Sequence, residues 1–331
     1  MTKIAIIGAG GWGTALAILL SRRGGSVTLW GYDPSHVEGL KTTRRNEPFL
    51  PGVELTPNIH PTNSFSEVAE AELILFVPPS KAMRSVAQHF AREKVSSDAV
   101  LLTCTKGIEL GSGLRMSEVI AEFFPGHAVA ALSGPSHAEE VSRGMPTAVV
   151  VGCHEQTALR KLQQLFSAGP FRAYTSEDMA GIELGGALKN VFAIAAGVSD
   201  GLGFGDNSKA ALVTRSLAEL MRLGAAMGGR RETFHGLSGV GDLMVTCFSK
   251  HSRNRGVGER LGKGETLAQI SGSMAMVAEG VPTAKSALEC AHRLGVSVPI
   301  IEQVHAILFE EKKPRDAMME LLSRDPRPEE D

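Results

Sequence analysis

The chain begins with a short apolar segment, residues 3–7, that leads directly into a glycine-rich turn. Gly8, Gly10 and Gly13 have the spacing G-x-G-x-x-G, and an apolar helical pattern covers residues 11–23. In such a unit the first glycine permits a tight turn, the second lets the backbone approach a pyrophosphate, and the third allows close helix–strand packing. The helix N-terminus then offers free amides to phosphate. The pattern predicts a dinucleotide site, and the simpler alternative is a tight strand–helix turn.

The rest of the first half alternates β-rich segments with helical ones. Strands are predicted over residues 3–7, 26–30, 73–77, 99–103, 128–132, 147–151 and 171–174. Helices are predicted between them over residues 11–23, 81–91 and 156–166. Several strands are continuous apolar runs, as expected where a parallel sheet is buried on both faces. The alternation indicates an α/β fold with a doubly wound sheet of the Rossmann type.

The pattern changes after Tyr174, because long helical segments follow and no strand is indicated. Ser176 is the predicted N-cap of an apolar helix that runs to about residue 198. Further helices are expected over residues 207–227, 266–270, 283–293 and 300–309, and loops over 201–205 and 236–241. The predicted organisation is a dinucleotide-binding domain at 1–176, an all-helical domain at 177–324 and a polar tail at 325–331.

Composition narrows the choice of partners. The 34 basic and 36 acidic residues give a net charge of −2, which argues against nucleic acid or an anionic membrane as partner. The four cysteines are widely spaced, which suggests neither a metal site nor a disulfide framework and fits a reducing cytoplasm. The first strand leaves no room for a signal peptide, and no apolar run has the length expected of a membrane span.

Lys189 is the strongest candidate for proton transfer. On a helix its neighbours four residues away are Gly185 and Ala193, so it has no local acidic partner and projects from a ridge of small residues. Desolvation in such a setting lowers the pKa of a lysine and suits it to acid–base chemistry. A surface lysine on a helix that packs through its small residues is an equally acceptable interpretation of the spacing alone.

Two further segments of the second half carry polar groups. Asp242 lies in a predicted glycine-flanked loop, followed by Thr246, and could orient the lysine or simply stabilise a turn. Ser252, Arg253 and Asn254 are followed by another arginine. Two guanidinium groups and an amide suit a phosphate, and a solvated loop is the alternative.

Two loops of the first half follow predicted strands, where ligands bind in doubly wound sheets. Residues 105–109 contain Lys106, a candidate contact for an anion. Residues 133–138 contain Ser136, which is expected to begin a helix, and His137. His137 could act as a base, although a surface histidine is the simpler expectation.

The choice between NADH and NADPH stays open. An NAD-selective site has an acid at the end of the second strand, and Asp33 lies slightly beyond that place. Arg44 and Arg45 could reach a 2′-phosphate, but a solvated loop is the simpler expectation for them.

Seven segments occur in an order that is more specific than the glycine motif alone. They are residues 8–13, 105–109, 133–138, 184–191, 239–247, 252–256 and 277–282. With them the chain resembles the bacterial type of NAD(P)-dependent glycerol-3-phosphate dehydrogenase over nearly its whole length. The resemblance implies reduction of dihydroxyacetone phosphate to sn-glycerol 3-phosphate for phospholipid synthesis. It also implies a cytoplasmic homodimer and a helical domain like that of 6-phosphogluconate dehydrogenase.

The resemblance also implies roles for individual residues. Lys189 would exchange a proton with the substrate C2 oxygen, and Asp242 would support it. The implied substrate contacts are Lys106, Gly134, Ser136, Lys189, Asp242, Ser252, Arg253 and Asn254. The implied cofactor contacts are Gly8, Gly10, Gly11, Trp12, Gly13, Tyr32, Lys106, Ala138, Arg253, Val277 and Glu279. No metal is implied.

Three features depart from the family pattern. Gly11 replaces a frequent serine, Tyr32 replaces a frequent histidine or arginine, and a second proline follows Pro78 in a loop that is commonly V-P-S. The first two leave the cofactor preference open, and the extra proline could change how that loop covers the cofactor.

Two other classes compete with this family. A β-hydroxyacid dehydrogenase would have an asparagine four residues after the lysine, where this chain has Ala193. A nucleotide-sensing regulator would lack the lysine and the polar groups around it. Both are less favoured than the dehydrogenase.

Overall fold

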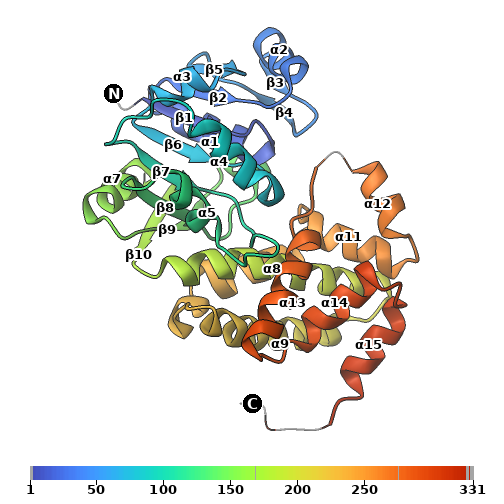
Figure 1. Ribbon diagram of the computed structural model, residues 1–331. Coiled ribbons are helices and arrows are strands. Elements are labelled where there is room, and N and C mark those ends of the chain that lie inside the picture. The colour runs from blue at the N-terminus through green and yellow to red at the C-terminus, as the bar shows by residue number, and fades with distance from the viewer. Residues whose placement is uncertain (1–2, 168, 275, 326–327, 329–331) are drawn as a thin grey trace.

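The computed structural model describes residues 3–167, 169–274, 276–325 and 328. A sheet domain, blue to green in Figure 1, lies above a helical domain coloured yellow to red. The last strand of the sheet ends at Ser176, and helix α8 (Met179–Gly201) follows between the two parts.

The main sheet has eight strands in the order β10-β9-β8-β7-β6-β1-β2-β5. Their bounds are β1 (Ile4–Ile7), β2 (Val27–Trp30), β5 (Ile59–Thr62), β6 (Leu73–Phe76), β7 (Val100–Thr103), β8 (Ala128–Ser133), β9 (Thr147–Cys153) and β10 (Phe171–Ser176). The pairings are parallel except that of β8 with β9, which is antiparallel. The predicted parallel sheet is therefore confirmed apart from one reversal, at the connection through α6 (Ala138–Ser142).

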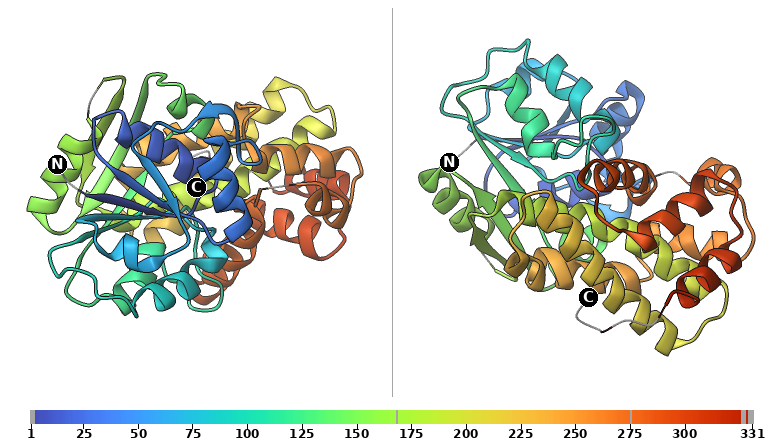
Figure 2. Two further views of the ribbon diagram at one scale, coloured as in Figure 1. Left: turned by 90° about the horizontal axis from the view of Figure 1, so that it is seen from above. Right: turned by 60° about the horizontal axis from the view of Figure 1, so that its bottom comes forward.

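Helices cover both faces of the sheet (Figure 2, left). On one face are α1 (Gly11–Ser21), α6 and α7 (Gln156–Phe166), which form a hydrophobic core with Ile4 and Ile6 of β1. On the other are α3 (Phe65–Ala69), α4 (Met83–Phe90) and α5 (Met116–Phe123), which pack with Ala5 and Ile7. Successive residues of β1 point to opposite faces, so its unbroken apolar pattern serves both cores.

The segment after β2 was not predicted. It contains α2 (Pro34–Thr43), the short hairpin of β3 (Arg45–Asn46) and β4 (Leu50–Glu54), and the edge strand β5. These elements carry polar or proline residues, and β5 reads Ile-His-Pro-Thr. An edge strand tolerates proline and lacks the apolar pattern of a central strand, so its sequence gives a weak signal.

After β10 the chain forms helices and connecting loops throughout the part that the structure describes. After α8 come α9 (Asp206–Ala226), α10 (Asp242–Phe248), α11 (Arg253–Gly262), α12 (Leu267–Ser273), α13 (Gly280–Leu294), α14 (Pro299–Phe309) and α15 (Pro314–Leu322). Helix α8 is buried along nearly its whole length, and the other helices gather around it (Figures 1 and 2). It is long and apolar enough to cross a membrane, which the sequence prediction had not recognised, but here it forms the centre of a domain.

Two expectations for α8 were wrong. Its N-cap is Asp178, whose Oδ1 accepts from the Gly181 amide at 2.8 Å, whereas Ser176 ends β10.

The small residues of α8 also do not form an open ridge, because a side chain at Gly197 would overlap the backbone carbonyl of Arg255 in α11. Gly258 of α11 approaches the Ile194 carbonyl as closely. Glycine on both helices lets their backbones meet, and this packing buries α8.

A buried carboxylate connects α8 to the sheet domain. Glu183 accepts hydrogen bonds from the Ser117 amide at 2.9 Å, the Ser117 hydroxyl at 2.6 Å and Nη1 of Arg115 at 2.5 Å. These groups form the N-terminus of α5. Burial raises the pKa of the Glu183 carboxyl, and Arg115 opposes that effect. The contact therefore fixes the position of α8 against the sheet.

Substituting Glu183 with alanine should lower the free energy of unfolding by about 3–5 kcal/mol, because it leaves buried donors and part of the Arg115 charge unpaired. Glu118 is the matched control, since it also pairs with Arg115 at 2.7 Å but is partly exposed. Glu118→Ala should cost only about 1 kcal/mol, as for loss of a helix cap. Urea unfolding measures both values, and equal losses would contradict a special role for Glu183.

Candidate active site

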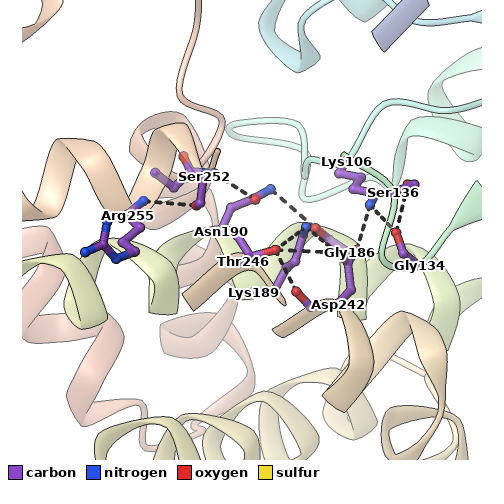
Figure 3. Close-up of polar contacts among 11 residues, drawn as sticks. Lys106, Gly134, Ser136, Gly186, Lys189, Asn190, Asp242, Thr246, Ser252 and Arg255 are labelled. Atoms are coloured by element: carbon purple, nitrogen blue, oxygen red, sulfur yellow. Dashed lines mark hydrogen bonds and ion pairs between the residues drawn. The ribbon is translucent and has the colours of Figure 1, made fainter. Parts of the chain in front are cut away.

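Lys189 lies in the middle of α8 and is buried among polar groups from α10. Its Nζ donates to Oδ1 of Asp242 at 2.5 Å and to Oγ1 of Thr246 at 2.7 Å (Figure 3). Asp242 is the first residue of α10 and follows a π-helical turn, Leu237–Gly241, so it does not lie in the predicted loop. The lysine has no partner on its own helix face, and the fold supplies one from 53 residues away.

Lys106 reaches the same carboxylate from the sheet domain. It lies in the loop after β7, and its Nζ donates to Oδ2 of Asp242 at 2.6 Å and to the Gly134 carbonyl at 2.8 Å (Figure 3). Gly134 follows β8 with φ +116°, a conformation that favours glycine, and the Ser136 hydroxyl donates to its carbonyl at 2.9 Å. One carboxylate thus bridges two ammonium groups at the boundary between the domains.

Burial and charge set the protonation of this group. Asp242 is only 1% exposed. Burial by itself raises the pKa of its carboxyl, but the charges and hydrogen bonds of Lys106 and Lys189 together outweigh burial and hold the pKa below its ordinary value. Burial lowers the pKa of Lys189 to about 8, with Asp242 opposing the effect and Lys106 adding to it. Lys189 can therefore gain or lose a proton near neutral pH.

Ser252, Arg253 and Asn254 lie at the N-terminus of α11, not in the solvated loop that was the alternative. The Ser252 side chain caps the helix by accepting from the Arg255 amide at 3.2 Å. The Asn254 side chain donates to Oδ1 of Asn190 at 2.8 Å and accepts from the Gly280 amide at 2.8 Å. Asn254 therefore connects three helices, α8, α11 and α13.

The two arginines of this segment differ. Arg253 is exposed, and its Nη1 donates to the Val277 carbonyl at 2.9 Å. Arg255 points away from the Lys189 group and pairs with Asp200 at 2.7 Å, so of these two arginines Arg253 is the candidate for a phosphate contact.

The glycine motif has the geometry that a dinucleotide site requires. Gly8 has φ +124°, and a side chain there would lie 2.7 Å from the Val77 carbonyl oxygen. A side chain at Gly13 would overlap the Gly8 carbonyl, so these two glycines serve the turn and the helix–strand contact. A side chain at Gly10, the N-cap of α1, would meet nothing within 4 Å. Open space over the helix N-terminus fits a bound pyrophosphate.

Neighbouring residues complete this end of the site. A side chain at position 11 would lie 2.5 Å from the Phe49 carbonyl oxygen, so the β3–β4 hairpin explains why Gly11 replaces serine. The indole Nε1 of Trp12 is buried and has no hydrogen-bond partner among the described residues, which leaves a donor for a ligand. Tyr32 is 87% exposed at the end of β2.

Asp33 and Arg44, two of the groups that could select a cofactor, already make local contacts. Asp33 caps α2 by accepting from the Ser35 amide at 2.9 Å. Arg44 donates to the backbone carbonyls of Thr56 and Ile59, so it does not extend toward a 2′-phosphate. The cofactor preference stays open.

The remaining residues of the expected cofactor site lie where the domains meet. Glu279, the N-cap of α13, accepts from the Ser80 amide at 2.9 Å and from the Ser80 hydroxyl. Ser80 ends the Val77-Pro78-Pro79-Ser80 loop, which is thereby held to the helical domain. Ala138 begins α6 and its N-cap is His137, so Ser136 does not open the helix as expected.

Thr246 and Asn190 belong to this site although the sequence prediction gave them no role. Thr246 follows Asp242 by four residues on α10, so a helical reading of that segment would have placed both side chains on one face. Asn190 accepts a hydrogen bond from Asn254 and so helps to position it. The two residues are brought together by the packing of α8 against α11.

The fold and the site together define a class: a dehydrogenase with a Rossmann-type nucleotide domain and a helical domain that holds a buried lysine–carboxylate pair. Two family models match, described as the NAD-dependent glycerol-3-phosphate dehydrogenase N-terminus over residues 3–159 and C-terminus over residues 178–319. The chain belongs to the NAD-dependent glycerol-3-phosphate dehydrogenase family. It is an NAD(P)-dependent oxidoreductase, which removes the sensor alternative, and its family membership removes the hydroxyacid alternative.

Individual relatives agree over the full length. The glycerol-3-phosphate dehydrogenase (NAD(P)+) of Geobacter sulfurreducens is 50% identical over 327 residues, covering 98% of this chain and 97% of that protein. The protein of the same name from Prosthecochloris aestuarii is 47% identical over 330 residues, covering 98% and 99%. The crystal structure of glycerol-3-phosphate dehydrogenase from Coxiella burnetii superposes with a TM-score of 0.94 at 37% identity, covering 98% and 99%.

The two glycines of the turn should respond differently to alanine. Gly13→Ala should lower the unfolding free energy by about 1–3 kcal/mol, because its methyl group overlaps backbone. Gly10→Ala should leave stability nearly unchanged but weaken cofactor binding, because its methyl group fills open space at the helix N-terminus. Thermal unfolding and NAD(P)H fluorescence titration measure the two effects. Unchanged cofactor affinity in a folded Gly10→Ala variant would place the pyrophosphate elsewhere.

Proposed function

We propose that this protein catalyses reversible hydride transfer between NAD(P)H and dihydroxyacetone phosphate, giving sn-glycerol 3-phosphate. The supporting observation is the carboxylate of Asp242 between Lys189 and Lys106, at the carboxyl ends of β7 and β8. Reduction of a ketone needs a proton donor beside the carbonyl oxygen. A buried lysine with a pKa of about 8 is suited to that task.

The chemistry divides between the cofactor and the side chains. When bound, the nicotinamide supplies the hydride. Lys189 donates a hydrogen bond to the C2 oxygen, stabilises the negative charge that develops there and delivers the proton. Asp242 orients the Lys189 ammonium, and Lys106 adds a second positive charge to the same region. In the reverse direction neutral Lys189 accepts the proton.

The rest of the proposed site positions the reactants. Arg253 and the N-terminus of α11 would hold the substrate phosphate, so that binding energy remote from the carbonyl aligns it. The proposed substrate contacts are Lys106, Gly134, Ser136, Lys189, Asp242, Ser252, Arg253 and Asn254. The proposed cofactor contacts are Gly8, Gly10, Gly11, Trp12, Gly13, Tyr32, Lys106, Ala138, Arg253, Val277 and Glu279. The proposed mechanism does not use a metal ion.

The proposal also covers the roles of the domains, the oligomeric state and the cellular compartment. Residues 1–176 would bind the dinucleotide, 177–324 would supply the catalytic helix, and 325–331 would be a polar tail, of which only Asp325 and Pro328 are described. We propose a cytoplasmic homodimer that acts on a small molecule for phospholipid synthesis, without nucleic acid or membrane insertion. The four cysteines are buried free thiols, as is typical of a reducing compartment.

Loss of nicotinamide absorbance tests the reaction directly. Dihydroxyacetone phosphate should be reduced, with NADH and NADPH assayed in parallel to establish the preference. Unphosphorylated dihydroxyacetone is the control and should react far more slowly, because it lacks the group that Arg253 would hold. Folded protein that binds NAD(P)H but does not reduce the phosphorylated ketone would rule out the proposed function.

Replacing Lys189 with methionine should lower kcat by a factor of about 10² to 10⁴, the usual contribution of a positioned acid–base group. Affinity for the cofactor should change little. Lys209→Met is the matched control. Lys209 lies on α9, is also buried, and pairs with a carboxylate, that of Asp200, at 2.8 Å. A similar loss of kcat in both variants would mean that Lys189 has only a structural role.

The pH dependence should follow the protonation of Lys189. Ketone reduction needs the charged lysine, so kcat/KM should be level below pH 8 and fall about tenfold per unit above it. The reverse reaction needs the neutral lysine and should show the opposite dependence. In Asp242→Asn the fall should begin at lower pH, because the carboxylate charge that raises the pKa of Lys189 is lost. If the fall in kcat/KM begins at the same pH in Asp242→Asn as in the wild-type protein, Lys189 is not the titrating group.

A further inference from the structure

His137 has a buried ring nitrogen that no described residue satisfies. It is the N-cap residue of α6 and directly follows Ser136 in the loop after β8. Its Nε2 is enclosed but has no hydrogen-bond partner in the part of the chain that the structure describes. Buried polar atoms are almost always paired, so an unpaired one beside the active-site loops points to a ligand.

The His137 ring lies close to the ring of His251, which comes just before the N-terminus of α11 in the helical domain. Its centroid lies 5.9 Å from that of His251, and the two rings are tilted by 56°. His251 directly precedes Ser252, which caps α11. The first amides of a helix have no intrahelical acceptor and favour an anion together with the helix dipole. His137 is therefore close to the place where Arg253 and α11 can receive phosphate.

Burial, more than the surrounding charges, favours the neutral form of the His137 imidazole. Burial lowers the pKa of His137, and Lys189 lowers it further, with a smaller contribution from Lys106. Glu139 and Asp242 act in the opposite direction without reversing the shift. A neutral imidazole still has one N–H donor and one acceptor nitrogen, and a doubly charged phosphate beside it favours the protonated form.

We propose that His137 is a specificity-determining residue, whose Nε2 donates a hydrogen bond to the phosphate group of the bound substrate. This rests on the proposed function, since it assigns a further contact to the phosphorylated ketone. The contact closes the phosphate site from the sheet domain, opposite Arg253 of the helical domain.

Steady-state kinetics of the full chain test the contact. His137→Phe keeps an aromatic ring and should raise KM for dihydroxyacetone phosphate about 10- to 100-fold, the loss expected for a hydrogen bond to a charged group. The kcat and the KM for cofactor should stay within about threefold, and His137→Gln, which keeps a donor, should recover part of the loss.

His127→Phe is the matched control. His127 also has a buried ring nitrogen, Nδ1, without a partner among the described residues, and its other nitrogen lies 3.1 Å from the Ser96 carbonyl. It directly precedes β8, at the end of the strand opposite to the loop that carries His137. Its substitution should leave KM unchanged. An unchanged KM in His137→Phe, or an equal rise in both variants, would overturn the proposal while leaving the dehydrogenase reaction intact.

NMR titration of the His137 ring gives a readout that does not depend on turnover. In the wild-type protein, glycerol 3-phosphate should raise the pKa of His137, and inorganic phosphate should do so at higher concentration, whereas glycerol should not. A pKa that does not respond to either phosphate would overturn the contact. A response without any ketone reduction would support the anion contact while rejecting the proposed function.

Discussion

The site depends on one buried carboxylate that two lysines share across a domain boundary. Removing a charge from water is costly, and Asp242 stays ionised because Lys106 and Lys189 approach its two oxygens from opposite sides. Neither domain alone can build this arrangement, because Lys106 comes from the sheet and the other two groups come from the helices. The site therefore forms only when the domains are packed together.

Helix α8 connects the site to both domains. Its glycines allow α11 to approach backbone to backbone, which buries the helix and places Asn190 beside Asn254. Glu183, on the same helix, holds the N-terminus of α5 in the sheet domain. Packing on one side and a polar contact on the other leave Lys189 in one position. The desolvation that lowers its pKa is a consequence of this packing.

The strength of the local signal decided which elements could be predicted. Central strands such as β1 and β6 are apolar throughout and were located within about one residue, since burial on both faces demands that pattern. Strand β5 and helix α2 were missed because elements at the edge need no such pattern. No helix is predicted over α10, and Asp242 is assigned to a loop, because the glycines before it form a π-helical turn that continues directly into α10.

The sequence by itself determined the glycine turn, because positive φ at Gly8 and the close contact at Gly13 are properties of a few adjacent residues. It also supplied a lysine without an acidic neighbour on its own helix. Only the tertiary structure decided what that lysine could do. Asp242 lies 53 residues from Lys189 and 136 residues from Lys106, and the pKa of a buried group depends on burial and on charges brought from such distances.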